Sequence, residues 1–316
     1  MTETESPGQG TRAETLSLRE RMVEFVHGLQ DRICTALEEI DGKGKFVEDR
    51  WERPGGGGGK TRVISDGHIF EKGGVNTSVV FGELHESIAR QMKIESGEFF
   101  ATGISLVIHP SSPRVPTVHA NYRYFEGPNG DAWFGGGADL TPYIADEWDG
   151  THFHSVMKEA CDLHGEDLYP RFKKECDDYF YIRHRKERRG VGGIFYDYLR
   201  GDADEMEQWF AFHQSAGNAF LPAYLPVVER HKDEPFNDRE KKFQLLRRGR
   251  YTEFNLVYDR GTKFGLETDG RIESILMSLP SVVHFDYDAD MEQTESERTL
   301  MRWLREPREW GMRNGE

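Results

Sequence analysis

The chain has 316 residues, of which 36% are hydrophobic and 12% aromatic, and its 56 acidic residues outweigh 41 basic ones to give a formal net charge of −15. This composition is typical of a folded water-soluble protein and not of a disordered chain, and the charge disfavours binding of nucleic acid or of an anionic membrane over most of the surface. No apolar run approaches the roughly 18 residues that a membrane helix needs, so we expect a cytoplasmic protein with no nucleic-acid partner and no integral membrane association.

The first 15 residues are polar and lack the apolar core of a signal peptide. We therefore expect a flexible leader over residues 1–15 and a single folded domain over residues 16–316. The three cysteines, Cys34, Cys161 and Cys176, are widely spaced and contain no C-x-x-C pair. This spacing argues against a disulfide framework, a zinc site or an iron–sulfur cluster, and it predicts buried cysteines that behave as small hydrophobic residues.

Residues 15–40 carry hydrophobic side chains at three- and four-residue spacing, which predicts an amphipathic helix capped by Ser17 or Thr15. Five glycines follow at 55–59, ahead of Lys60. A phosphate-binding loop is disfavoured there, because Pro54 stands where the motif requires its first glycine and no apolar strand leads into the loop. We expect a mobile surface or lid loop instead.

From Phe99 onward the hydrophobic pattern alternates with a period of two, which predicts strands in "TGISLVIHP", "TVHANYRYF" and "AWFGGGADLTPY". The turn signals between them, "SSPRVP" and "EGPNGD", indicate an antiparallel meander. The glycines at 135–137 indicate a bulge or a close approach of a ligand within the third strand.

Residues 151–189 are predicted to return to helix, with Phe172, Cys176, Phe180 and His184 on its inner face. The glycines at 190, 192 and 193 would end it and start the strand "GIFYDYL". A further helix is expected within "EMEQWFAFHQSAGNAFLPAYLPVVERH", followed by a second group of strands in "YTEFNLVYDRGTKFGL" and "RIESILMSLP". The order of strands, helices and strands predicts an α+β fold in one domain.

Polar side chains line one face of the second predicted strand. His119, Asn121 and Arg123 would lie about 7 Å apart along it, beside Ser105 and His109 on the neighbouring strand. A proton donor, an amide and a fixed cation in one line are suited to hold and protonate an anionic ligand. The alternation equally allows a solvent-exposed polar face without a ligand. Asp139 adds a carboxylate after the glycines, where backbone can approach a ligand closely.

Two other groups of residues leave alternatives open. His109, His119, His154 and His184 could converge as metal ligands, although the chain lacks a compact ligand motif and histidines more often serve structural or acid–base roles. The cationic run at 183–189 either complements the C-terminal end of a helix or forms an RNA site. The acidity of the rest of the chain favours the first interpretation.

Several longer motifs resemble one known family. They occur in its order and approximate spacing, and they are "SLVIHP", "TVHANYRYF", "WFGGGADLTPY", "YIRHRKERRGVGGIFYDYL" and "GLETDGRIESILMSLP". Over roughly residues 18–310 the sequence is similar to the oxygen-dependent coproporphyrinogen III oxidases. The resemblance implies an enzyme of haem biosynthesis that oxidatively decarboxylates the ring A and B propionates of coproporphyrinogen III to vinyl groups, giving protoporphyrinogen IX and consuming two O2. It also implies a large curved antiparallel sheet flanked by helices, and a homodimer with residues 251–280 in or near the contact.

The resemblance also implies the roles of individual residues. His119 matches the acid/base histidine, Arg123 a catalytic and substrate-binding cation, and Asp139 the carboxylate proposed to hold the pyrrole NH groups. Further substrate contacts would come from Ser105, Asn121, Tyr122, Gly270 and Arg271. A second aspartate of the family motif is replaced by Tyr198, so any role it had passes to that residue or lapses.

No organic cofactor is implied, O2 is the co-substrate, and a divalent metal at His109, His119, His154 and His184 is an alternative. Two other functions stay open beside the oxidase. One is a 2-His-1-carboxylate iron oxygenase using His109, His119 and Asp139. The other is a non-enzymatic protein that binds a tetrapyrrole or another anion.

Overall fold

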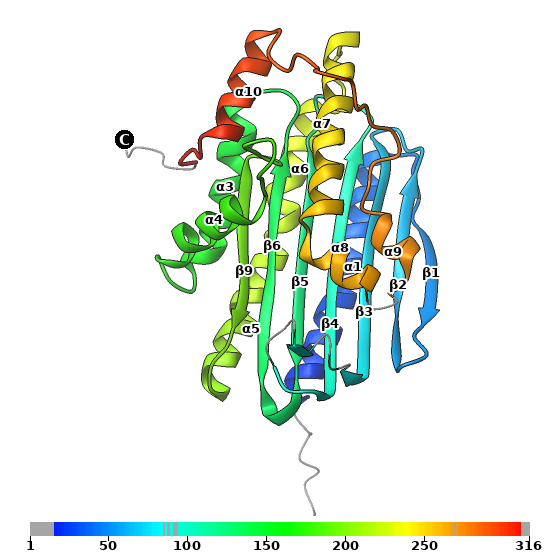
Figure 1. The fold of residues 1–316 in the computed structure, drawn as a ribbon, viewed down its shortest axis with the longest axis vertical. Helices are drawn as coiled ribbons and strands as arrows, with labels where there is room; N and C mark the ends of the chain where they lie inside the picture. The colour runs from blue at the N-terminus through cyan, green and yellow to red at the C-terminus, as the bar shows by residue number, and fades with distance from the viewer. Residues whose placement is uncertain (1–15, 85, 87–88, 91–93, 268–269, 311–316) are drawn as a thin grey trace, which may run out of the picture.

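The computed structural model describes residues 16–84, 86, 89–90, 94–267 and 270–310, so the predicted leader at 1–15 lies outside the described residues. At the centre is a seven-stranded antiparallel sheet in the order β1-β2-β3-β4-β5-β6-β9 (Figure 1). Successive strands of the chain are neighbours from β1 to β6, which confirms the predicted meander. The strands are β1 (Val47–Glu52), β2 (Gly57–Ser65), β3 (Phe70–Leu84), β4 (Gly97–Pro110), β5 (Thr117–Glu126), β6 (Ala132–Thr141) and β9 (Gly192–Leu199).

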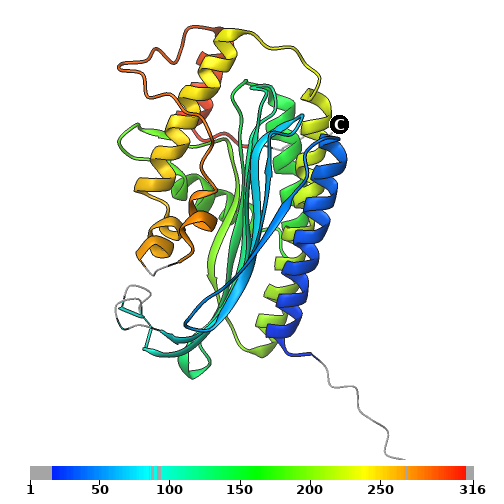
Figure 2. The same ribbon diagram turned by 90° about the vertical axis from the view of Figure 1, so that its right-hand side faces the viewer.

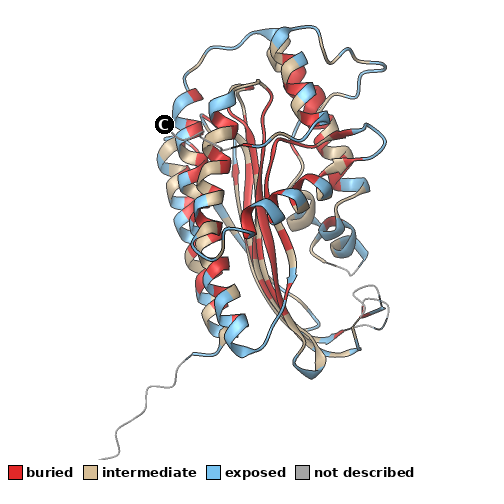
Figure 3. Ribbon diagram, turned by 90° about the vertical axis from the view of Figure 1, so that its left-hand side faces the viewer, coloured by how far each residue is buried: buried red, intermediate tan, exposed pale blue. Residues whose placement is uncertain are grey.

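One face of the sheet is covered by α1 (Leu18–Asp41), α3 (Glu147–Asp162), α5 (Ala203–Asn218) and α6 (Phe220–His231) (Figure 2). The predicted N-terminal helix is confirmed, and the Ser17 side chain caps it in a capping box with Glu20. Alternate residues of the strands, such as Ile104, Tyr122 and Ile194, are buried beneath these helices in one hydrophobic core. In Figure 3 the buried colour accordingly follows the sheet and the inward sides of the helices.

The opposite face of the sheet lies under a second layer of helices, α7 (Asp238–Val257), α8 (Arg260–Glu267) and α9 (Ile272–Leu276) (Figure 2). The prediction of a second strand group in this region is therefore wrong. An Asn237–Glu240 capping box starts α7, and ion pairs attach this helix to its surroundings. Buried Arg247 pairs with Glu187, and the buried guanidinium of Arg248 lies 2.9 Å from Glu71.

The predicted helix over 151–189 is also wrong at its C-terminal end. The segment forms α3 and α4 (Leu168–Tyr179), followed by a hairpin of β7 (Tyr181–Ile182) and β8 (Glu187–Arg188). The backbone N–H of Arg189 donates to the carbonyl of Phe180 at 3.0 Å and closes the hairpin. His184 consequently lies in an exposed turn and not on a buried helix face, with 41% of its side chain accessible.

The five-glycine segment is mostly strand. Gly57, Gly58 and Gly59 belong to β2 and pair with β3, so the prediction of a mobile loop over 55–59 is wrong for these residues. A Cβ on Gly59 would lie 2.5 Å from the Trp51 ring, which explains why this position lacks a side chain. The described residues also form a short 3-10 helix at Pro128–Gly130 and α10 (Glu295–Arg305).

The three cysteines are free and buried, as predicted, and burial raises the pKa of the Cys34 thiol to about 12. Within the described ranges no helix is both long enough and apolar enough to cross a membrane.

Candidate active site

Five of the predicted site residues meet on the sheet face that lies under α7, α8 and α9, which we call the site face. Cross-strand pairing places Ser105 opposite Asn121, and His119 opposite Asp139. Arg123 lies on the same face as His119 and Asn121, because side chains two residues apart on a strand point the same way. The predicted alternation is thus confirmed. Glycines 103 and 135 are the cross-strand neighbours of Arg123, and Gly137 lies opposite Asn121. Because these positions carry no side chain, the surface of the sheet around Arg123 and Asn121 is formed mainly by backbone atoms.

His119, Asp139 and Arg189 form a continuous hydrogen-bonded chain. The His119 Nδ1 atom lies 2.8 Å from Asp139 Oδ1, and Arg189 Nη2 lies 2.9 Å from each of the two carboxylate oxygens. The Asp139 and Arg189 side chains are almost fully buried, whereas 21% of the His119 side chain is accessible. The exposed end of this hydrogen-bonded chain is therefore the His119 imidazole, and its orientation is fixed by its bond to the buried Asp139.

The charges of this chain set the protonation state of Asp139. Burial acts to raise the pKa of its carboxyl, but the positive charge of Arg189 and the bond with His119 outweigh burial and bring the pKa below the usual 3.8. Asp139 is consequently ionised at neutral pH. The Asp139 carboxylate is buried and already accepts hydrogen bonds from His119 and Arg189, so a bound ligand has little access to it.

Further contacts hold Arg189 in place. Its Nη1 donates to Asn255 Oδ1 at 2.8 Å, and its guanidinium carbon lies 4.1 Å from the centre of the Phe180 ring and 4.4 Å from that of Tyr251. The sequence interpretation missed this residue because it assigned the whole cationic run to the end of a helix. Only the hairpin turns Arg189 inward while Arg185 pairs with Glu253 at the surface.

Arg123 forms a second polar group on the site face. Its Nη1 donates to Asn121 Oδ1 at 2.9 Å, and its Nη2 lies 2.9 Å from Asp197 Oδ2. The pair crosses Gly135, where a Cβ would lie 2.6 Å from Asp197 Oδ1 and 2.8 Å from Arg123 Nη2. The absent side chain at Gly135 therefore makes room for this ion pair. Asp197 was not among the predicted site residues.

The other predicted substrate contacts lie elsewhere. The Tyr122 side chain points to the opposite face of the sheet, is fully buried, and donates to the Ala216 carbonyl at 2.9 Å. Gly270 and Arg271 precede α9, and Arg271 pairs with Asp49 of β1. These two residues thus lie above the β1 side of the site face, four strands away from Arg123.

The four predicted metal-binding histidines do not converge. Within the described part of the chain, no group of three potential ligands includes any of them, so neither the four-histidine site nor the triad of His109, His119 and Asp139 is formed. Other side chains or backbone carbonyls occupy both ring nitrogens of three of these histidines. The contacts are His109 to Thr117 and Ser278, His154 to Tyr169 and Val191, and His184 to Tyr258 and Glu253.

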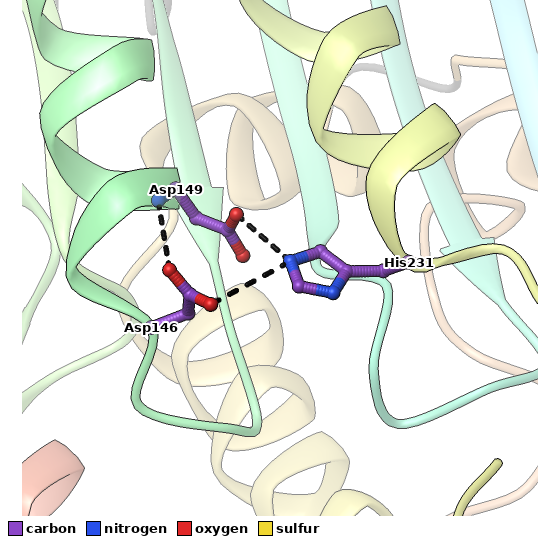
Figure 4. Close-up of side chains that lie close together, drawn as sticks. All are labelled: Asp146, Asp149 and His231. Carbon is purple, nitrogen blue, oxygen red and sulfur yellow. Dashed lines mark hydrogen bonds and ion pairs between the residues drawn. The ribbon is translucent and has the colours of Figure 1, made fainter. Parts of the chain in front are cut away.

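A different group has metal-ligand spacing among the described residues, and it consists of Asp146, Asp149 and His231 (Figure 4). His231 Nε2 lies 2.9 Å from Asp149 Oδ1. The guanidinium of Arg230 already lies between the carboxylates, with Nη1 2.7 Å from Asp146 and 3.2 Å from Asp149. Asp146 also caps α3. These contacts describe an ion-paired helix cap, and Arg230 supplies the positive charge that a metal would bring.

Comparison with known proteins identifies the family of the chain. The sequence matches the family described as coproporphyrinogen III oxidase over residues 21–310. It is 51% identical over 309 residues to the chloroplastic oxygen-dependent coproporphyrinogen-III oxidase of Glycine max, covering 93% of this chain and 80% of that protein. It is 50% identical over 307 residues to the mitochondrial oxygen-dependent coproporphyrinogen-III oxidase of Homo sapiens, covering 93% and 67%. Coproporphyrinogen-III oxidase 1, chloroplastic, of Arabidopsis thaliana is 50% identical over 309 residues, covering 93% and 80%. The chain therefore belongs to the coproporphyrinogen III oxidase family.

Proposed function

We propose that this chain is an oxygen-dependent coproporphyrinogen III oxidase of haem biosynthesis, and that its reaction takes place on the site face. Each of two propionic acid side chains, on rings A and B, loses CO2 and two hydrogen atoms to become a vinyl group. One O2 per side chain accepts the two electrons and two protons. The observation that carries the proposal is that Asp139 and Arg189 fix the orientation of His119. The Arg123 cation lies on the same strand and on the same face of the sheet.

His119 acts as the proton donor or acceptor. Its Nδ1 is bound to Asp139, which leaves Nε2 as the atom that exchanges a proton with the substrate. Asp139 is a positioning residue that fixes the tautomer and orientation of the imidazole, much as a buried carboxylate does in hydrolytic triads. The resemblance implies that Asp139 also holds the pyrrole NH groups, and this role stays a prediction.

Arg123 binds a propionate. Its guanidinium is planar and always charged, and 37% of its side chain is accessible beside Asn121. Ser105 and Asn121, which lie opposite each other on β4 and β5, supply neutral hydrogen-bonding groups near Arg123. A reduced, electron-rich macrocycle can provide electrons to O2 itself, so we propose that no organic cofactor takes part.

The proposal is tested with coproporphyrinogen III prepared under anaerobic conditions and mixed with the purified protein. Products are separated by chromatography in air, without O2, and after exhaustive chelation. We expect protoporphyrinogen IX only in air, with full activity after chelation. No product in air would refute the proposed activity, and loss of product after chelation would point to a required metal, for which Asp146, Asp149 and His231 are the group to substitute.

Substituting Gly135 by alanine is expected to lower kcat/KM about tenfold. The added methyl group would lie 2.6 Å from Asp197 Oδ1 and would push Arg123 out of its position. Steady-state kinetics measure the effect. Gly28→Ala is the matched control, because a Cβ there meets only Arg32 at 3.4 Å. An unchanged kcat/KM in Gly135→Ala would remove the Arg123–Asp197 pair from substrate binding.

We further propose a homodimer in the cytoplasm. Five exposed hydrophobic side chains on α7, α8 and α9 support the dimer, namely Leu256, Val257, Phe264, Leu266 and Ile272. Light scattering should give twice the chain mass of 36.4 kDa. A single-chain mass at micromolar concentration would refute the dimer. The plant and human relatives are named as chloroplastic and mitochondrial, so the cellular location is to be measured by imaging in the source cells.

A further inference from the structure

Tyr196 of β9 lies beneath the site face, on the side of the sheet that α5 covers. It is fully buried and lies opposite Gly136 of β6. A Cβ on Gly136 would lie 3.0 Å from the Tyr196 hydroxyl, so the phenol occupies the space that a side chain there would need. The neighbours of Gly136 along the strand, Gly135 and Gly137, lie among the polar residues of the site face. A single layer of glycine backbone therefore lies between the phenol and the site.

The Tyr196 hydroxyl is hydrogen-bonded to a fully buried histidine of α5, at 2.9 Å from His213 Nδ1. Burial raises the pKa of the Tyr196 phenol, and burial together with the positive charge of Arg123 lowers the pKa of His213 to about 3. At neutral pH the phenol consequently keeps its proton and donates, while the neutral imidazole accepts through Nδ1.

The surroundings of His213 are aromatic. The centre of its ring lies 5.5 Å from that of Tyr122 and 5.0 Å from that of Phe134. Its Nε2 atom is buried and has no hydrogen-bond partner among the described residues. A buried ring nitrogen without a partner costs stability, and a phenylalanine would fill this space without that cost. A histidine differs from phenylalanine here in that it can take up the proton of the phenol.

Aromatic rings also connect Tyr196 to the surface of the protein. The ring centres of Tyr196 and Phe212 are 5.0 Å apart, and those of Phe212 and Trp209 are 6.3 Å apart. Trp209 is only partly buried. An electron from a reductant in solution can therefore reach Tyr196 in short steps.

We propose that Tyr196 and His213 form a redox-active pair that takes up an oxidising equivalent escaping from O2 reduction on the site face. This inference rests on the proposed function, which brings O2 to that face. O2 has unpaired electrons and the reduced macrocycle has none, so electrons pass to O2 one at a time. The hydroperoxyl radical is then the one-electron stage on the way to H2O2, and it is the oxidant that the pair removes.

The step is balanced in electrons and protons. Tyr196 gives one electron to the hydroperoxyl radical, which takes a proton from solvent and leaves as H2O2. The O–H bond of Tyr196 breaks and its proton forms an N–H bond at His213 Nδ1, because a phenol that has lost an electron is a far stronger acid than an imidazolium ion. An electron from a reductant of the ascorbate or thiol class, together with the proton held on His213, restores the tyrosine.

The test compares the wild type with Tyr196→Phe, His213→Gln and Tyr224→Phe. Tyr224→Phe is the matched control, because Tyr224 is also fully buried but its hydroxyl donates to the Pro116 carbonyl at 2.9 Å, which cannot take up a proton. Protein and coproporphyrinogen III are mixed anaerobically, exposed to O2 and frozen at increasing times, and radicals are detected by EPR spectroscopy. Protein containing ring-deuterated tyrosine identifies a tyrosyl radical by its narrower signal.

A second arm omits the substrate and uses a photogenerated ruthenium(III) complex as the oxidant, so that the pair is tested even in a protein that forms no product. Thermal unfolding of each variant checks that the fold is kept. In both arms the wild type and Tyr224→Phe should give a long-lived tyrosyl signal, and Tyr196→Phe should lose it. His213→Gln should lose it as well, since an amide accepts a hydrogen bond but not a proton. The initial rate of product formation should be the same in Tyr196→Phe, but activity should be lost after fewer turnovers.

The outcomes separate the inference from the proposed function. A wild type that forms product without a tyrosyl signal during turnover, or with the same signal in Tyr196→Phe, would overturn the redox role alone. A long-lived signal in the ruthenium arm that disappears in Tyr196→Phe, in a protein that forms no product in air, would support the redox-active pair and refute the oxidase activity. Neither product nor a long-lived tyrosyl signal from the wild type would overturn both.

Discussion

Replacing His119 by alanine is expected to lower kcat by about 10²–10⁴-fold, the usual contribution of a positioned general acid or base. The side chain reaches the surface of the site face and is 21% accessible, so its removal leaves no large cavity in the core. Folding should therefore change far less than turnover. The measurements are kcat at saturating coproporphyrinogen III and the free energy of unfolding in urea.

His152→Ala is the control for this variant, because His152 also has an accessible imidazole but lies on α3, on the other face of the sheet, where its Nε2 contacts the Pro222 carbonyl at 3.0 Å. Its kcat should equal that of the wild type. Turnover retained in His119→Ala within a factor of about three would remove the imidazole from the proton-transfer step.

Replacing Asp139 by alanine is expected to reduce the free energy of unfolding by about 3–5 kcal/mol, because it leaves the Arg189 charge buried without its partner. The same variant should also lower turnover. The burial of both members of the ion pair now predicts a large effect on each. Turnover should fall at least about 100-fold, since His119 loses the carboxylate that orients it.

The double substitution Asp139→Asn with Arg189→Met separates the two effects. It removes both charges, so most of the lost stability should return, whereas turnover should stay low because no carboxylate faces His119. Arg189→Met alone should destabilise about as much as Asp139→Ala. A loss of less than about 1 kcal/mol in either single variant would show that the pair behaves like an exposed salt bridge.

Acidification provides an independent measurement of the same pair. The pKa of Asp139 in the folded protein lies below its usual value of 3.8, so the folded state binds fewer protons than the unfolded state in that pH range. The stabilisation is complete above the ordinary carboxyl pKa and is lost as the pH falls toward the lower folded pKa. The double variant lacks this part of the pH dependence.

The strands β4, β5 and β6 could be predicted because one side of each faces the core and the other faces the site. The helix α7 could not, because buried polar residues interrupt its apolar stripe. Gln244, Arg247, Arg248 and Asn255 all lie at buried positions, and only their tertiary partners make those positions stable. Strand β1 was missed for a related reason, since "VEDRWE" at an exposed edge shows no hydrophobic alternation.

Some residues of the candidate site could likewise be predicted from the sequence and others could not. Spacing along one strand sufficed to group His119, Asn121 and Arg123, because the period of a strand is fixed. Arg189 and Asp197 come from other elements, and only the folded chain places them against Asp139 and Arg123. Four histidines were grouped by residue type alone, and the hydrogen bonds of His109 and His154 to buried partners show why type was insufficient.

The two helix layers are attached to the sheet by different forces. Apolar contacts hold α1, α3, α5 and α6 against one face, whereas charged and polar contacts such as Arg248 with Glu71 hold much of α7 above the other. Local stability is lower where fewer apolar groups are buried. Substitution of one partner of these buried ion pairs is therefore expected to loosen the α7–α9 layer, while apolar contacts keep α1, α3, α5 and α6 on the sheet.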